Sequence, residues 1–247
     1  MSSGPADGRH YPMSQLNIIG HRGAAGHAPE NTLLSFQKAI ELGCQAVEMD
    51  VHLSKDGEVV VIHDAKVDRV TGVSGKVKKM TLAELKKLYC PMHQCLPTLQ
   101  EVIDLCKGRV RMFIELKAKG TPEAVAKLIA ANKIEHEVVI LSFKIGLLKR
   151  IKRLNSRLKV IYLFYRKPLR LWHQVKSVPL DYIGTRLKAA TAKLVRRAHR
   201  LRRRVYVYNV NDVMAGLKLK DWKVDAICTD YPILFTKPRR RRPASGE

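Results

Sequence analysis

The chain has 247 residues, 46% of them apolar, so it can bury the core of one α/β barrel or of two average domains. Its 46 lysines and arginines outnumber 22 aspartates and glutamates and give a formal charge of +24, which predicts attraction to phosphorylated substrates, phospholipid surfaces or nucleic acid. Charged residues interrupt every apolar run well before the roughly 20 residues that span a bilayer, which excludes a transmembrane helix.

Residues 1–15 lack the basic start and the apolar stretch of a secretory signal, and we interpret them as a disordered leader. The five cysteines are odd in number and scattered, which fits free thiols in a reducing compartment better than a disulfide framework. Cys90, His93 and Cys95 invite a zinc interpretation, but they lack the paired elements of a structural site. We therefore expect a cytoplasmic protein, with peripheral membrane contact as an option.

From residue 17 onward, short β-branched runs alternate with amphipathic stretches, which is typical of repeated βα units and a parallel sheet. The eight predicted strands are Asn17–Gly20, Ala46–Leu53, Val110–Leu116, Glu137–Leu141, Lys159–Phe164, Tyr182–Gly184, Val205–Tyr208 and Ala226–Thr229. The helices predicted between them are Thr32–Leu42, Leu99–Cys106, Pro122–Asn132, Ile145–Leu154, Leu169–Lys176, Ala192–Leu201 and Val213–Leu219. This alternation favours a single (β/α)8 TIM barrel over residues 16–236, with a doubly wound open sheet as the alternative.

One segment breaks the alternation after the second strand. The turn Ser54-Lys55-Asp56-Gly57 joins that strand to a second β run, 58–62, and this predicts a hairpin. A turn centred on residues 55 and 56 would bring His63 opposite Glu48. Residues 64–98 then form a loop-rich insertion with one short helix near Leu82–Leu88, for which Thr81 and Glu84 match a capping box.

Polar residues close the apolar runs of the first half of the chain. In a barrel, the carboxyl ends of the strands meet at the catalytic face, and alternation turns Glu48 and Asp50, and likewise Glu115 and Lys117, to the interior. Three carboxylates buried together are costly without compensation, and oxygen ligands suit Mg²⁺ or Ca²⁺. The alternative is a set of ordinary ion pairs, such as Glu115 with Lys117.

The order of five motifs then resembles the glycerophosphodiester phosphodiesterase family, within the phosphatidylinositol phosphodiesterase-like barrel superfamily. The motifs are HRG at 21–23, PENT at 29–32, ExD at 48–50, HD at 63–64 and ExK at 115–117, and the resemblance extends from Asn17 to Pro232. It implies that His21 and His63 are the acid/base pair. It implies further that Glu48, Asp50 and Glu115 hold one divalent cation and that Arg22 and Lys117 bind the substrate phosphate.

The chain departs from the family pattern at two places. Tyr208 stands where the family usually has tryptophan, and Cys90–Cys95 replaces an aromatic, proline-rich stretch. We expect both regions to shape the pocket for the substrate alcohol.

The resemblance implies hydrolysis of glycerophosphodiesters to glycerol 3-phosphate and an alcohol. Histidines suit the proton transfers because an imidazole pKa near 6.5 allows one ring to start neutral and the other charged. Water and the neighbouring hydroxyl of the substrate glycerol both stay open as the nucleophile, as do the head group and the oligomeric state.

Two other functions are weighed against this one. The segment Tyr165–Trp172 combines cations with apolar residues, as the lipid-facing lip of a lysophospholipase D would, although Leu171 and Trp172 also fit the buried side of the next helix. The second alternative is a catalytically silent basic barrel that binds nucleic acid or an anionic membrane, and it depends on charge alone.

Two arginine clusters lie away from the predicted catalytic residues. They comprise Arg196, Arg197, Arg200, Arg202, Arg203 and Arg204, and Arg239–Arg242 in a basic tail of residues 237–247. We hypothesise that they hold the protein at anionic surfaces through the opposite face of the barrel. The alternative is a solvated basic face without a dedicated partner.

Overall fold

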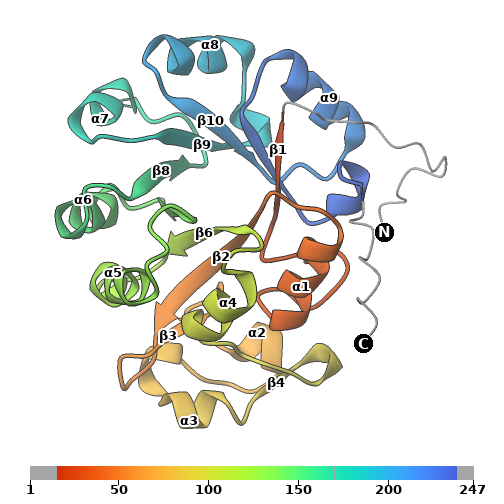
Figure 1. Cartoon of the computed structure of the whole chain (residues 1–247), viewed down its shortest axis with the longest axis vertical. Helices are drawn as coiled ribbons and strands as arrows, with labels where there is room; N and C mark the ends of the chain where they lie inside the picture. Colours follow the sequence, from red (N-terminus) through yellow and green to blue (C-terminus); the bar gives the residue numbers. More distant parts are fainter. Residues whose placement is uncertain (1–15, 170, 238–247) are drawn as a thin grey trace, which may run out of the picture.

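The computed structural model describes residues 16–169 and 171–237, and its centre is a closed barrel of eight parallel strands (Figure 1). The strands are β1 (Asn17–Gly20), β2 (Ala46–Leu53), β6 (Arg111–Leu116), β7 (Val138–Ser142), β8 (Lys159–Phe164), β9 (Tyr182–Arg186), β10 (Arg204–Tyr208) and β11 (Ala226–Thr229). The barrel closes because β1 pairs with β2 on one side and with β11 on the other. The open-sheet alternative is therefore wrong. The predicted leader and the Arg239–Arg242 cluster lie outside the described residues.

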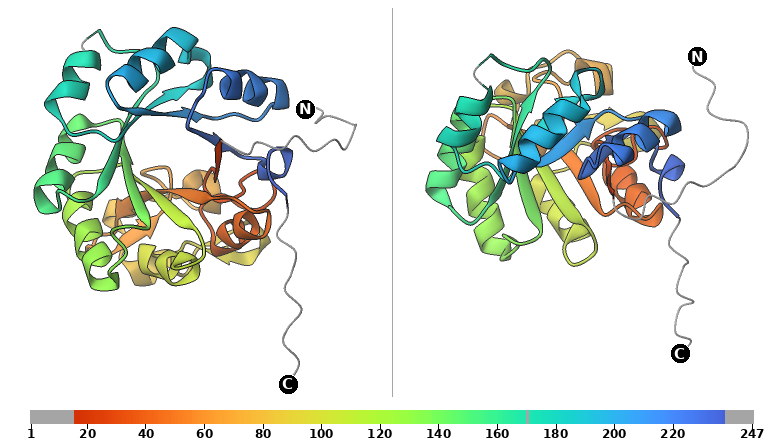
Figure 2. Two further views of the ribbon diagram at one scale, coloured as in Figure 1. Left: turned by 45° about the horizontal axis from the view of Figure 1, so that its top comes forward. Right: turned by 90° about the horizontal axis from the view of Figure 1, so that it is seen from above.

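Helices cover the outside of the strands, as both views in Figure 2 show. They are α1 (Leu33–Glu41), α4 (Leu99–Cys106), α5 (Thr121–Asn132), α6 (Ile145–Leu154), α7 (Leu171–Ser177), α8 (Ala192–Arg200) and α9 (Val213–Asp221). Threonine hydroxyls cap the first turns of α1, α4 and α8 by accepting backbone N–H groups that would otherwise lack partners. No helix within the described ranges has the length and apolar character needed to cross a bilayer.

The two sides of each strand lie in different environments. In β2, Val47, Met49 and Val51 pack among the helices in the main apolar cluster, while Ala46 packs with the residues that fill the barrel interior. Glu48 and Asp50 share the side of Ala46 because strand side chains alternate. The sequence prediction that these carboxylates face the interior is confirmed by their burial at 3% and 1% exposure.

The predicted hairpin is present, but its register is one residue off. β2 pairs with β3 (Val59–Val61) so that Val51 lies opposite Val61. The loop contains three residues between Ser54 and Glu58, and Gly57 adopts φ 87°, a left-handed conformation that suits glycine in such loops. The prediction that His63 pairs with Glu48 is therefore wrong, since the ladder ends before His63.

The insertion after β3 lies at one edge of the ring of helices (Figure 1). It contains η1 (Val77–Lys79), α2 (Asp68–Thr71), α3 (Leu82–Leu85), and the small hairpin of β4 (Tyr89–Cys90) and β5 (Gln94–Cys95) across η2 (Pro91–His93). Two further 3-10 turns, η3 (Leu187–Ala189) and η4 (Pro232–Leu234), follow β9 and β11. The capping box of Thr81 and Glu84 is confirmed, and none of the five cysteines, all within the described residues, forms a disulfide.

Candidate active site

The loop after β1 starts the site. Gly23 has φ 87°, and a Cβ there would lie 2.4 Å from the Ser35 hydroxyl oxygen, so the turn against α1 requires glycine. The turn directs the backbone N–H of Arg22 to Oε2 of Glu48 at 3.0 Å. The HRG motif thus presents two side chains at the barrel mouth and fixes a carboxylate below them.

Three carboxylates converge at the end of β2 and its neighbour β6. Glu48, Asp50 and Glu115 each offer an oxygen within 4.8 Å of the others, and all three are buried. In the part of the chain that the structure describes, Cys90, His93 and Cys95 form no comparable group. The zinc interpretation therefore has no support here.

The pKa values of these carboxyls reflect crowding of negative charge. Burial, together with the charges of Asp50 and Glu115, raises the pKa of Glu48 well above its usual range. Burial and Asp50 raise the pKa of Glu115 to about 7. Asp50 is also buried, but Lys117 and Arg22 hold its pKa below the usual value. Burial and crowding therefore favour the neutral forms of Glu48 and Glu115, while Asp50 stays ionised.

Two cations lie against the cluster. Lys117 Nζ is 3.0 Å from Glu115 and 3.2 Å from Asp50, and Arg22 Nε is 3.3 Å from Asp50. The Arg22 Nε contact lacks hydrogen-bond geometry, so this buried donor has no hydrogen-bond partner among the described atoms. Glu30 accepts from Arg22 Nη1 at 2.7 Å, and the Asn31 amide donates to Asp50 at 3.0 Å. The PENT segment therefore positions both an arginine and a carboxylate of the site.

Each predicted catalytic histidine is paired with an aspartate. His21 Nδ1 lies 2.6 Å from Asp230, which follows β11, and His63 Nδ1 lies 2.6 Å from Asp64. A carboxylate acceptor at Nδ1 favours the proton on that nitrogen and an unprotonated Nε2. The Asn209 amide nitrogen is a second polar neighbour of His21, 2.7 Å from Nδ1 and 3.4 Å from Nε2. His21 Nε2 is 4.0 Å from Glu48. Burial lowers the pKa of His63.

A further network braces the two aspartates. Asn211 donates to Asp230 at 2.5 Å, and despite burial the hydrogen bond from His21 lowers the pKa of Asp230 to about 2. Arg69 of α2 donates to Asp64 at 2.7 Å and through both Nη atoms to Glu30 at 2.8 Å. The insertion thus contributes an arginine that ties the His63 side of the mouth to the PENT segment.

These residues surround one cavity of about 420 Å³. Its lining includes His21, Arg22, Asp50, His63, Glu115 and Lys117. Six of the seven predicted site residues therefore meet, and Glu48 lies beside them through its contacts with Arg22 and His21.

The opposite wall of the cavity is aromatic and basic. Phe143 stacks on Tyr165 with centroids 4.4 Å apart, and Tyr208 meets Phe143 edge-on. Arg186 lies 5.5 Å from the Tyr165 ring, and Lys188 completes this wall. Tyr208 lines the cavity as expected, whereas Cys90–Cys95 is not part of its lining.

Sequence reasoning assigned no role to Asp230, Asp64, Arg69 or Glu30. The available signal for Asp230 was its position directly after the last strand, the same position that identified the other site residues. The contacts of Arg69 depend on how the insertion folds back on the barrel.

Known proteins with similar sequences and structures agree with this arrangement. Residues 21–234 match the model of the "Glycerophosphoryl diester phosphodiesterase family". A glycerophosphodiester phosphodiesterase of Bacillus altitudinis is 31% identical, over 90% of this chain and 97% of its own. A Thermotoga maritima glycerophosphodiester phosphodiesterase has a TM-score of 0.77 at 28% identity, with 89% of this chain and 96% of that chain covered. An Oleispira antarctica phosphodiesterase, solved with the product sn-glycerol-3-phosphate, has a TM-score of 0.81 at 28% identity over 88% and 94%.

Proposed function

Because this chain belongs to the glycerophosphoryl diester phosphodiesterase family and is a phosphoric diester hydrolase, we propose that its barrel mouth cleaves glycerophosphodiesters to glycerol 3-phosphate and an alcohol by histidine acid/base catalysis with a divalent cation. The supporting observation is the convergence of six predicted site residues on one cavity beside three buried carboxylates. The Oleispira relative with its bound sn-glycerol-3-phosphate supports the same product.

The carboxylate cluster fits a hard divalent cation. Glu48, Asp50 and Glu115 offer only oxygen ligands. Burial first, and then repulsion among the three carboxyls, raises the pKa values of Glu48 and Glu115, and a bound cation would favour their ionised forms. Such a cation, held by these three residues, would neutralise charge on the phosphate oxygens. Both Mg²⁺ and Ca²⁺ suit this ligand set.

The other side chains of the mouth have separate roles in phosphate binding and proton transfer. Arg22 and Lys117, each held beside Asp50, are placed to bind phosphate oxygens. One imidazole removes the proton of the nucleophile, either water or the neighbouring glycerol hydroxyl, and the other protonates the leaving alkoxide. If the hydroxyl attacks, water must then open the cyclic phosphodiester to give glycerol 3-phosphate. Asp230 and Asp64 orient His21 and His63 by accepting from Nδ1, which keeps Nε2 available for these transfers.

The aromatic and basic wall bears on the leaving alcohol. Arg186 and Lys188 are positive, and the carboxylates that line the cavity lie at the other side, at Asp50 and Glu115. A quaternary ammonium group would meet these cations on entering the wall. We therefore expect neutral or anionic alcohols to be preferred over choline.

Neither alternative function gains support. In the segment expected to form a lipid lip, Leu171 is buried and Trp172 packs against the core, so the helix interpretation of these two residues is confirmed. A basic wall is also poorly suited to an acyl chain. The silent barrel is contradicted by the family and by the intact convergence of catalytic residue types.

The test is an assay of the purified full chain for release of glycerol 3-phosphate from glycerophosphoethanolamine and glycerophosphoglycerol. We expect turnover that excess chelator abolishes and that added Mg²⁺ or Ca²⁺ restores. Full turnover of an extensively dialysed enzyme in chelator would contradict the metal assignment. Absence of turnover with every divalent cation would contradict the substrate assignment.

A further inference from the structure

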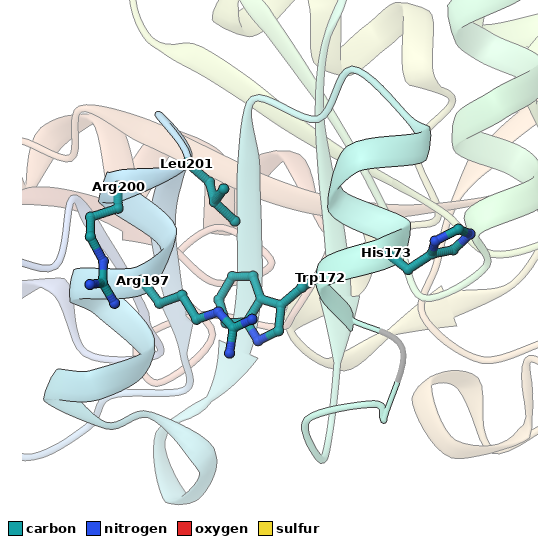
Figure 3. A pocket seen from close by; sticks show the side chains of 5 residues that line it. All are labelled: Trp172, His173, Arg197, Arg200 and Leu201. Carbon is teal, nitrogen blue, oxygen red and sulfur yellow. The ribbon is translucent and has the colours of Figure 1, made fainter.

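A groove lies between α7 and α8 on the outside of the barrel, separate from the catalytic cavity (Figure 3). One part, of about 390 Å³, is lined by Trp172, Arg197 and Arg200 among others. The adjoining part, of about 360 Å³, shares Trp172 and Arg197 and adds Arg166, Lys167 and Lys193. The groove therefore gathers five cationic side chains around one indole ring.

These cations lack counter-charges within the molecule. No carboxylate lines either part of the groove. Across residues 16–169 and 171–237, none of the five takes part in an ion pair, although Arg22, Arg69 and Arg150 each do. All five are exposed. The groove is consequently a local source of positive potential that an external anion can neutralise.

The arrangement at the centre of the groove favours a phosphate. The Arg197 guanidinium lies 4.5 Å over the Trp172 ring (Figure 3), which orients its plane and leaves its N–H edge for an acceptor. The buried indole Nε1 of Trp172 has no hydrogen-bond acceptor among the described atoms. A planar fork of N–H donors matches two phosphate oxygens.

The loop between β8 and α7 links the groove to the catalytic mouth. Tyr165 lines the catalytic cavity, whereas Arg166 and Lys167, next in sequence, line the groove. Leu169 on the same loop is fully exposed, at 103% of its reference area. An exposed apolar side chain among cations suits the headgroup region of a bilayer, where charge and apolar contact act together. It adds nothing to contact with a nucleic-acid backbone.

We propose that this groove binds the phosphate of an anionic phospholipid headgroup, with Leu169 entering the bilayer interface beside it. The anchoring surface then runs along the side of the barrel and reaches the loop at the catalytic face. This differs from the expectation that the α8 arginines act from the opposite face, because Arg197 reaches Trp172 and the groove. The inference does not depend on the identity of the hydrolysed substrate.

The experiment measures binding of the full chain to phosphatidylcholine vesicles with and without phosphatidylglycerol at about 0.1 M salt, where the Debye length is about 10 Å. The groove variant carries Lys193→Gln and Arg197→Gln. The control variant carries Lys149→Gln and Arg153→Gln on α6, two exposed cations that form no ion pair with any described residue, so both variants lose the same charge. A third variant, Leu169→Ser, changes no charge.

We expect the groove variant to bind phosphatidylglycerol vesicles about 30-fold more weakly, since each basic side chain at an anionic surface contributes about 1 kcal/mol. The control should change less than about threefold, because its charges are separated from the contact by screening. Leu169→Ser should weaken vesicle binding and leave soluble-substrate turnover within about threefold of the parent, a range of under 1 kcal/mol.

Three results would overturn the proposal. Equal losses in the groove and control variants would show that net charge alone drives binding. Parental vesicle binding by the groove variant would remove the groove from the contact. Tighter binding to a random single-stranded oligonucleotide than to vesicles, lost in the groove variant but unaffected by Leu169→Ser, would assign the groove to nucleic acid.

Discussion

The catalytic mouth and the α7/α8 groove are both rich in cations, but they differ in whether these cations have carboxylate partners. In the mouth, Arg22 and Lys117 each lie within 3.3 Å of a carboxylate. In the groove, the five cations have no carboxylate partner among the described residues. Paired charges are fixed before the substrate arrives, as a preorganised site requires. Unpaired charges can bind an anion from outside the molecule. Substitutions in the mouth should therefore change turnover, and substitutions in the groove should change vesicle binding.

The largest expected effect concerns the carboxylate cluster. Asp50→Asn should reduce turnover by at least about 10³-fold, because it weakens a proposed metal ligand and removes the anion that both Arg22 and Lys117 contact. Vesicle binding should be unchanged. Asp104→Asn, an exposed change on α4, is the control and should leave turnover intact. Retained turnover in Asp50→Asn would place the essential charge elsewhere.

The histidines test the mouth next. His21→Ala and His63→Ala should each lower kcat by roughly 10² to 10⁴, the usual effect of losing a general acid or base. The double variant should lose much less than the product of the two, because both residues serve one step. His136→Ala, on an exposed side chain, should have no effect. A folded His63→Ala enzyme with normal kcat would show that the hairpin does not supply a catalytic group.

A smaller effect should appear at the basic wall of the catalytic cavity. Arg186→Glu should raise the kcat/KM for glycerophosphocholine relative to glycerophosphoglycerol by about five- to tenfold, an effect of roughly 1 kcal/mol for an exposed charge. Arg186→Gln should give an intermediate ratio. Arg157→Glu, an exposed arginine outside the cavity lining, serves as the control. An unchanged substrate ratio in Arg186→Glu would separate this arginine from alcohol selection.

A further effect, on stability and not on turnover, also distinguishes the two regions. The pKa of Asp230 is about 2 in the folded chain and near 3.9 when unfolded, so ionised Asp230 stabilises the fold above pH about 4 and this contribution disappears toward pH 2. Asp230→Asn should therefore lower the free energy of unfolding by up to about 2 kcal/mol at neutral pH, with the difference shrinking in acid. Urea unfolding at a series of pH values measures this. A pH-independent difference would refute it.

The groove variant provides the contrast in the same measurement. Lys193→Gln with Arg197→Gln removes cations that have no described carboxylate partner, but it also removes the contact of Arg197 with the Trp172 ring. Its free energy of unfolding should therefore fall by at most about 1 kcal/mol, and by the same amount at every pH.

Much of the barrel could be predicted because local sequence determines it. β1, β2, β8 and β11, together with α4 and α6, have the predicted bounds. In these elements the apolar period and the flanking polar residues both mark the same ends. The small hairpin of β4 and β5 was not predicted, because two-residue strands leave no periodic signal.

The residues that line the candidate site could be predicted from the sequence, but the contacts between them could not. The strand ends identified the residues that meet at one cavity. The register of the hairpin depends on the conformation of Gly57, which the sequence pattern did not determine. The predicted register was wrong by one residue, and this error gave His63 the wrong partner. The pairing of His21 with Asp230 joins positions 209 residues apart, and no local pattern encodes such a contact.

That contact also gives the order in which activity arises during synthesis. Translation delivers His21 directly after the first strand of the barrel and Asp230 only after the last one. β1 has β2 as an early neighbour, but its longer pairing, with β11, forms only when the last strand has emerged. A nascent chain that stops before residue 230 therefore carries the residues of the mouth without the carboxylate that orients the first histidine. Hydrolysis should therefore begin only after β11 and Asp230 have joined the barrel, so activity reports that the last strand has assembled with the first.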